Sequence, residues 1–216
     1  MLIINGNIKT MAGVTYSNGY IYVENGKIAG IGEGACDEEL LNRERALGTV
    51  LDVNGALVMP GLIEAHCHMG ITEEKKGMEG DDCNENVEPV TPFLRAIDAI
   101  NTMDVAFSDA IGAGITSAMI GPGSSNVVGG QFAFIKLKGR RIDDLIVKAP
   151  AAMKVAFGEN PKVNFSGQSK SPVTRMAIAS ALREELLDAK EYFDEMLRVA
   201  NGAVIFGMNY FHEYLP

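Results

Sequence analysis

Beyond Pro60-Gly61 the chain alternates between short apolar runs typical of strands and longer amphipathic stretches typical of helices. The strand-like runs cover residues 62–65, 114–120, 131–137 and 151–157. The helical stretches, 91–113 and 171–200, each open with a capping hydroxyl and a proline, Thr91-Pro92 and Ser171-Pro172. Strands that alternate with helices predict parallel βαβ units, so the expected fold class is α/β.

The first 59 residues have a different pattern. Residues 19–24 alternate between apolar and polar side chains, Asn25-Gly26 is a hairpin signal, and residues 27–31 form the return strand. The sequence therefore predicts a small β-layer over residues 1–59 and a separate α/β region over residues 60–216. Residues 37–46 can form either a short helix or a charged loop.

Composition excludes some classes of partner and favours a compartment. The 216 residues have a formal net charge of -9, which disfavours a nucleic-acid partner. We expect no signal peptide and no membrane span, because no apolar run approaches about 18 residues. The three cysteines, Cys36, Cys67 and Cys83, are odd in number and lack Cys-x-x-Cys spacing, so a reducing cytoplasm is the expected location.

Two histidines follow the first buried strand of the α/β region. Side chains alternate along a strand, so His66 and His68 share a face with Glu64, and their Cα atoms lie about 6.6 Å apart. Neutral imidazole is the commonest metal-binding side chain, which makes this pair a candidate site for a divalent ion. The alternative is that both histidines only cap a buried strand.

The segment around these histidines extends the argument to a family. A β-layer followed by Pro60-Gly61-Leu62-Ile63-Glu64-Ala65-His66-Cys67-His68 resembles the metal-dependent amidohydrolase superfamily, and more narrowly its imidazolonepropionase-like members. The resemblance covers residues 1 to about 198, with Glu64 where the family more often has Asp. It implies a (β/α) barrel with a β-sandwich built from both chain ends, and hydrolysis of linear or cyclic amides with one or two metal ions. Zinc is the expected metal, with His66 and His68 as its first ligands.

Two later segments also resemble this family. Residues 114–126 resemble its second barrel strand and the following loop, and Val128-Gly129-Gly130-Gln131 leads into the third strand. Asn126 and Gln131 would then contact the substrate at the barrel mouth, or else the loop is a plain structural turn. It lacks the Gly-Lys-Ser/Thr ending of a P-loop, so a nucleotide site is not expected.

Residues 152–161 resemble the next barrel strand, which ends in an acid. In the superfamily a carboxylate or a carboxylated lysine supplies a metal ligand at this stage. Glu159 is the preferred candidate, because it follows the strand at its mouth, and Lys154 is the second candidate. The alternatives are a solvated loop acid for Glu159 and a lysine beside the core for Lys154.

The chain also departs from the family pattern. A complete barrel takes roughly 250 residues, so residues 60–216 are expected to form an incomplete, TIM-like barrel, the N-terminal portion of a truncated enzyme. No general base is identified, and the segment around His212 does not resemble the next strand. The expected partners are a small amide substrate and either a second copy or a complementary chain that completes the barrel. The alternative function is an inactive fragment that binds metal or another protein, and the acidic run 73–88 is a candidate lid over the site.

Overall fold

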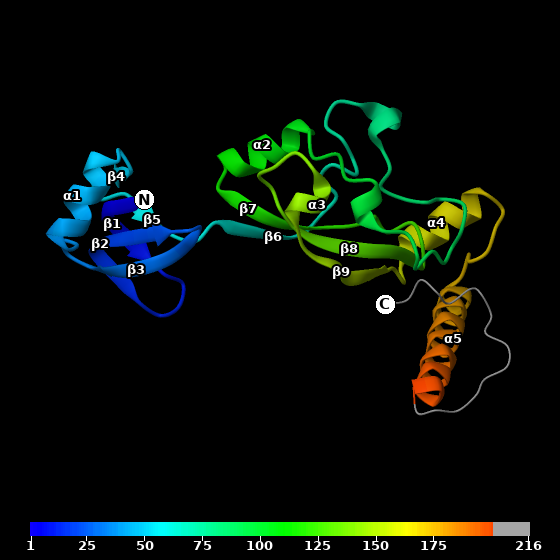
Figure 1. Cartoon of the computed structure of the whole chain (residues 1–216). Coiled ribbons are helices and arrows are strands. Elements are labelled where there is room, and N and C mark those ends of the chain that lie inside the picture. Colours follow the sequence, from blue (N-terminus) through cyan, green and yellow to red (C-terminus); the bar gives the residue numbers. More distant parts are fainter. Residues whose placement is uncertain (201–216) are drawn as a thin grey trace. The chain divides into compact units, whose positions relative to one another are not determined.

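The computed structural model describes residues 1–200 and divides the chain into two compact units, with the boundary after Gly61 (Figure 1). The boundary expected from the sequence, after residue 59, lies two positions earlier. The first unit contains β1 (Leu2–Lys9), β2 (Thr15–Glu24), β3 (Lys27–Glu33), α1 (Glu38–Ala46), β4 (Val50–Asp52) and β5 (Leu57–Val58). These strands form one sheet in the order β3-β2-β1-β4, and β5 pairs with the far end of β1.

The predicted hairpin is present in this sheet. β2 and β3 pair antiparallel, and Asn25 and Gly26 between them have φ angles of 51° and 73°. Both values lie in the left-handed region that a two-residue hairpin turn of the primed type requires. The apolar side chains of Leu2, Ile8 and Ile21 are buried in this unit.

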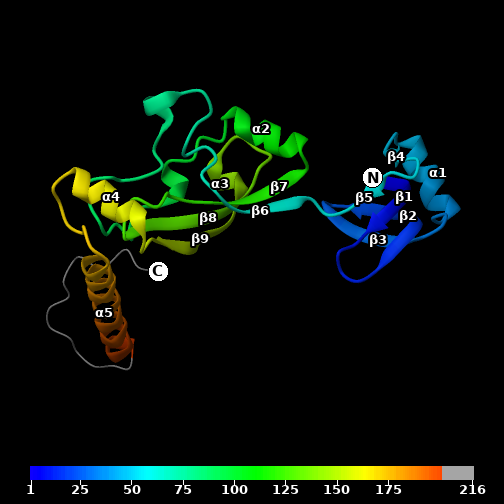
Figure 2. The same cartoon turned by 180° about the vertical axis from the view of Figure 1, so that it is seen from behind.

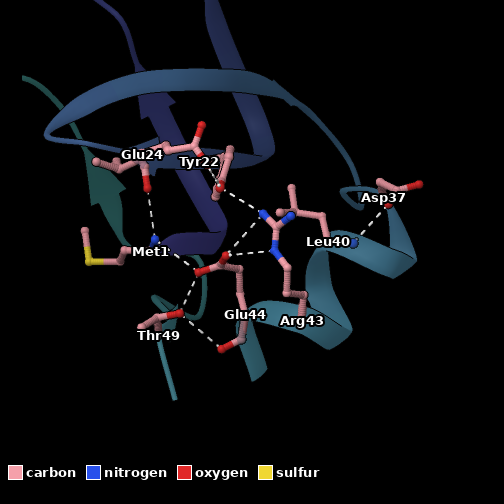
Figure 3. Close-up of polar contacts among 9 residues, drawn as sticks. Met1, Tyr22, Glu24, Asp37, Leu40, Arg43, Glu44 and Thr49 are labelled. Atoms are coloured by element: carbon pink, nitrogen blue, oxygen red, sulfur yellow. Dashed lines mark hydrogen bonds and ion pairs between the residues drawn. The ribbon is translucent and has the colours of Figure 1, made fainter. Parts of the chain in front are cut away.

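Residues 38–46 form a helix, which settles the two alternatives left by the sequence (Figure 3). Asp37 caps α1 by accepting a hydrogen bond from the Leu40 amide at 3.0 Å. On the same helix the buried carboxylate of Glu44 accepts a hydrogen bond from the Thr49 hydroxyl and pairs with the Met1 amino group at 3.1 Å. Glu44 therefore links α1 to the beginning of β1 and to the segment before β4. The hydrogen bonds from Thr49 and from the amino terminus lower the pKa of Glu44.

The second unit is built on a four-stranded sheet (Figure 2). Its elements are β6 (Leu62–Cys67), η1 (Gly77–Gly80), η2 (Ala96–Asp98), α2 (Val105–Gly112), β7 (Ile115–Ile120), β8 (Val128–Lys136), α3 (Ile142–Leu145), β9 (Ile146–Val155), α4 (Glu159–Gly167) and α5 (Arg175–Ala200). The strand order is β6-β7-β8-β9. The fold class is mixed α/β, and the four predicted strand regions are all present.

The strand directions differ from the parallel arrangement expected from the sequence. β6 and β7 are parallel, with α2 in their connection, as predicted. β7 and β8 are antiparallel, and so are β8 and β9. The reason is the length of the connection: residues 121–127 are too few for a parallel crossover, which needs a dozen or more residues. As a result β6, β7 and β9 run in one direction and β8 runs in the other.

The helix predicted over residues 91–113 is limited to α2 and the short turn η2. The start of this stretch instead runs beside β8, with bridges from Val90 to Val128 and from Arg95 to Gln131. Thr91 caps no helix, because its buried hydroxyl donates to the Val128 carbonyl at 3.1 Å. Asp104 is the N-cap of α2 and accepts a hydrogen bond from the Ala106 amide.

The other long helix, α5, begins later than predicted. Arg175 is its first residue, and the Thr174 hydroxyl rather than that of Ser171 accepts a hydrogen bond from the Ala177 amide at 3.1 Å. Within residues 1–200 no helix has both the length and the apolar character needed to cross a bilayer.

Buried apolar side chains form two clusters in the second unit. The larger joins the sheet to α2, α3 and the segments before α2 and comprises Ile71, Cys83, Ala96, Ile100, Phe107, Ala118, Ile120, Ala133, Ile135, Leu137 and Leu145. In the smaller one Val127, Val128 and Ile178 pack with Val90, Ala181 and Leu182. The second cluster attaches the first turns of α5 to the start of β8.

Candidate metal centre

The chemically informative side chains lie at one end of the sheet, where three of its strands have their carboxyl ends. Because β8 is antiparallel to β7 and β9, its amino-terminal end lies at the same end of the sheet as the carboxyl ends of β6, β7 and β9. His66 lies near the end of β6, His68 directly follows this strand, and Lys154 lies near the end of β9. Loops and strand ends at this end of a sheet can place side chains from distant parts of the sequence around one ligand.

The His68 ring is oriented by the end of the neighbouring strand. Its Nδ1 atom lies 2.6 Å from the Gly121 carbonyl oxygen, immediately after β7. A carbonyl oxygen only accepts hydrogen bonds, so Nδ1 carries the proton and the lone pair is on Nε2. A second partner of this kind is what orients most metal-binding histidines.

The His66 ring lies next to His68 and to an aromatic side chain of β8. The two imidazole centroids are 5.5 Å apart with an interplanar angle of 86°, and the Phe132 ring is 5.2 Å from His66. Desolvation lowers the pKa of His66, and the positive charges of Lys154 and His68 lower it further. A lowered pKa favours the neutral imidazole, which is the form that binds metals.

Gly121 and Phe132 support the histidine pair, and the sequence analysis assigned neither a role. A Cβ atom on Gly121 would lie closer than 3.0 Å to three atoms of the Phe132 ring, so only glycine fits there without movement. Phe132 itself is buried. The position of Gly121 directly after a strand signalled a turn, but the packing of a ring against it depends on the antiparallel course of β8.

Lys154 is the third side chain at this end of the sheet. It pairs with Gly130 of β8, and its Cγ atom would lie 3.3 Å from a Cβ on Gly129. Burial lowers the pKa of Lys154, whose charge in turn affects the pKa of His66. The second candidate of the sequence analysis therefore lies in the electrostatic environment of the histidines.

Glu159, the preferred candidate, lies elsewhere. It is the first residue of α4, is exposed, and borders an open surface hollow together with Lys162 and Arg175. Within residues 1–200, no three or more His, Cys, Asp or Glu side chains come together as a metal-binding group. The two histidines and Glu159 therefore do not form one cluster in the described part of the chain, and His212 lies outside it.

The two residues expected to contact substrate have structural partners. The Asn126 side chain is 1% exposed, and its Nδ2 atom donates to the carbonyl oxygens of Glu85 and Glu88. Its Oδ1 atom is buried without a hydrogen-bond partner among the described residues. Gln131 is also buried, and its Nε2 atom donates to the Pro92 carbonyl at 3.1 Å. Both side chains brace the loops beside the sheet. Their contact with a substrate stays a prediction.

The acidic segment after the histidines is anchored near its start. The Asp104 carboxylate accepts a hydrogen bond from the Glu74 amide, and the Asn101 side chain donates to Glu73 at 2.7 Å. Residues 81–85 line a cavity of about 180 Å³ together with residues 94–96, Pro122 and Gly129. Since Pro122 follows Gly121 and Gly129 faces Lys154, this cavity lies beside the histidine pair.

Comparisons with known proteins agree with the family inferred from the motif. No protein-family model matches the chain. Amidohydrolase tasK of Hapsidospora irregularis is 30% identical over 179 residues, which are 77% of this chain and 18% of that protein. A 5-methylthioadenosine/S-adenosylhomocysteine deaminase of Syntrophobacter fumaroxidans is 39% identical over 74 residues, which are 33% of this chain and 16% of that protein.

A solved structure extends the agreement to the fold. The crystal structure of an amidohydrolase from Thermotoga maritima matches 96% of this chain with a TM-score of 0.85 and 34% sequence identity. The chain covers 52% of that structure, so it spans about half of its length and less than a fifth of either curated relative. Sequence and structure together show that the chain belongs to the amidohydrolase superfamily.

Proposed function

We propose that this chain provides the metal-binding end of a hydrolase that cleaves carbon–nitrogen bonds in small amides or cyclic amides. The observation that carries the proposal is the pair of adjacent imidazoles at the carboxyl end of β6, one of them fixed by a backbone carbonyl. The names of the similar proteins, two amidohydrolases and a deaminase, support this class of reaction.

The two histidines fit a shared zinc ion. Zinc–nitrogen bonds are about 2.0–2.1 Å long, so a ring centroid lies roughly 3 Å from a bound ion. Centroids 5.5 Å apart can therefore face one ion from two directions. His68 would use Nε2, because Nδ1 is occupied by the Gly121 carbonyl. A zinc ion held there would polarise the scissile carbonyl and promote attack by water at neutral pH.

Lys154 is the better-placed third ligand. Lys154 lies at the same end of the sheet as the two histidines, whereas Glu159 is exposed at the start of α4. Its lowered pKa increases the share of neutral amine at neutral pH, the form that can react with carbon dioxide to give a carboxylated lysine. We propose this carboxylated form as the ligand, so that the protein supplies one carboxylate and two imidazoles.

The other residues around the site position these groups. Gly121 holds the tautomer of His68, Phe132 packs against His66, and the cavity lined by residues 81–85 offers space for a small substrate. We further propose that the second unit is part of a TIM-like barrel of the imidazolonepropionase-like type, since β6, β7 and β9 run in one direction and end at the site. The free thiols of Cys36, Cys67 and Cys83 support a cytoplasmic location.

A titration with zinc, followed by an assay of amine release from N-acyl amino acids and dipeptides, tests the proposal. We expect one zinc ion per chain at the histidines. Lys154→Met should weaken zinc binding by about tenfold or more, in the range typical for removal of a supporting or ligating group, while Glu159→Gln should not. Equal effects of the two substitutions would contradict the choice of Lys154.

Hydrolysis provides the second readout. Zinc binding without release of amine from any of these substrates would favour the alternative of an inactive metal-binding module. Release of amine that persists in the His66→Asn/His68→Asn variant would overturn the proposed site. The matched control is Lys148→Met, because Lys148 lies on β9 at the opposite end from Lys154.

A further inference from the structure

The four-stranded sheet of the second unit has two open edges. Among residues 1–200, β6 pairs only with β7, and β9 pairs only with β8. Both edge strands also expose large apolar side chains: Leu62 is 51% exposed, Ile63 62% and Val147 51%. Unpaired edges with apolar side chains are the usual points at which another chain adds to a sheet.

The directions of the edge strands allow the two edges to meet. β6 is parallel to β7, β7 is antiparallel to β8, and β8 is antiparallel to β9. β6 and β9 therefore run in the same direction, so β9 of one copy can pair in parallel with β6 of a second copy. A two-fold axis repeats this contact at the other two edges and gives eight strands with no edge left open.

The charges on the two edge strands are complementary. β6 carries the acidic Glu64, and β9 carries the basic Lys148. Opposite charges on neighbouring strands favour pairing, whereas like charges facing each other oppose it. Pairing of β9 with β6 therefore suits the charges better than pairing of β9 with another β9.

α5 has an apolar stripe that its own sheet covers only near the start of the helix. Near its start Ile178 and Leu182 pack against Val127 and Val128. Further along, Leu186 is 60% exposed and Phe193 is 60% exposed. These exposed side chains add apolar surface that a second copy can bury.

We propose that a second copy of this chain binds at both open edges, with β9 of each copy paired in parallel with β6 of the other. The contact is isologous overall and buries the exposed side chains of Leu62, Ile63 and Val147. It does not depend on bound metal or on catalysis.

Sedimentation equilibrium of the purified chain, without added metal, tests the proposal. The expected result at micromolar concentrations is a species of twice the chain mass of 23.2 kDa. Ile63→Lys and Val147→Lys should each weaken dimerisation by about tenfold or more, because each places an unpaired charge in the contact. The matched control is Met78→Lys: Met78 is 93% exposed in η1, outside the sheet, and this variant should dimerise like the wild type.

Hydrogen exchange of the wild-type chain keeps the test independent of the variants' folding. The outward amides of β6 and β9 should gain protection as the concentration rises through the dimerisation range. A monomer at all concentrations would overturn the proposal. A dimer in which the amides of neither edge strand gain protection would also overturn it. The same holds if the Ile63→Lys and Val147→Lys variants are folded and dimerise as strongly as the wild type.

Discussion

Replacing Gly121 by alanine should damage both the fold and the histidine pair. The added Cβ atom would lie closer than 3.0 Å to three atoms of the Phe132 ring, and no flexible side-chain end is available to move aside. The ring is 5% exposed and packs against His66, so relief of the overlap has to displace either the ring or the carbonyl that orients His68. Overpacking of this kind costs about 1–3 kcal/mol, and we expect a loss of about 2–3 kcal/mol in the free energy of unfolding.

Urea unfolding followed by circular dichroism measures the loss, and Gly112→Ala is the matched control. Gly112 lies in α2, and a Cβ there would meet no atom within 4 Å. Alanine is favoured over glycine within a helix, so the control should be as stable as the wild type or more stable by about 0.5–1 kcal/mol.

A double variant separates the overlap from other effects of the extra methyl group. Phe132→Ala alone should be destabilising, because it leaves a cavity, but adding it to Gly121→Ala should cost less than the sum of the two single changes. Gly121→Ala with wild-type stability and an unchanged His68 ring signal in NMR spectra would refute the assignment of Gly121 and Phe132 as supports of the site.

Two further substitutions test the braces of each unit. Asn126→Ala should lower the free energy of unfolding by about 2 kcal/mol, because the carbonyls of Glu85 and Glu88 lose their donor; a melting temperature equal to that of wild type would contradict this. Glu44→Gln should reduce the acid sensitivity of the first unit. The folded pKa of Glu44 is lowered, mainly by the hydrogen bond from Thr49, so its contribution is complete above the unfolded pKa and is lost as the pH falls through the folded value. Parallel stability curves of wild type and Glu44→Gln between neutral and acidic pH would contradict that role.

The sequence predicted the parts of the fold that depend on local pattern. The hairpin around Asn25-Gly26, the strand that leads into the two histidines, and the parallel pairing of β6 with β7 are all present. In each case a local signal was sufficient: the turn chemistry, the two-residue alternation of a strand, or a helical stretch between two strands. The residues from Pro60 to His68 were also sufficient to indicate the superfamily.

The parts that were wrong depend on contacts between distant segments. The parallel direction assigned to β8 overlooked the length of the connection, residues 121–127, which was visible in the sequence. The helix expected from Thr91 was wrong because residues 90–95 bridge to β8, and periodicity alone cannot detect such competition. α4, which carries Glu159 in its first turn, was not predicted, although a proline in the first turn, here Pro161, is typical of a helix start.

The site shows the same division between local pattern and distant contacts. Alternation along β6 placed both histidines on one face. Glu159 was preferred over Lys154 because it was expected to follow directly on a strand over residues 151–157. β9 ends at Val155, and the chain then enters α4. The bracing roles of Asn126 and Gln131 depend on backbone carbonyls some forty residues earlier in the chain, which no local pattern indicates.

Nitrogen NMR of the imidazole rings during a zinc titration tests the central claim most directly. We predict that the ring signals of His66 and His68 change together and are complete at one zinc ion per chain, with the metal on Nε2 of His68. His212 provides an internal reference ring in the same spectrum. If the signals of His66 and His68 respond at different zinc concentrations, or do not respond, the two imidazoles do not share an ion and the proposed metal centre is wrong.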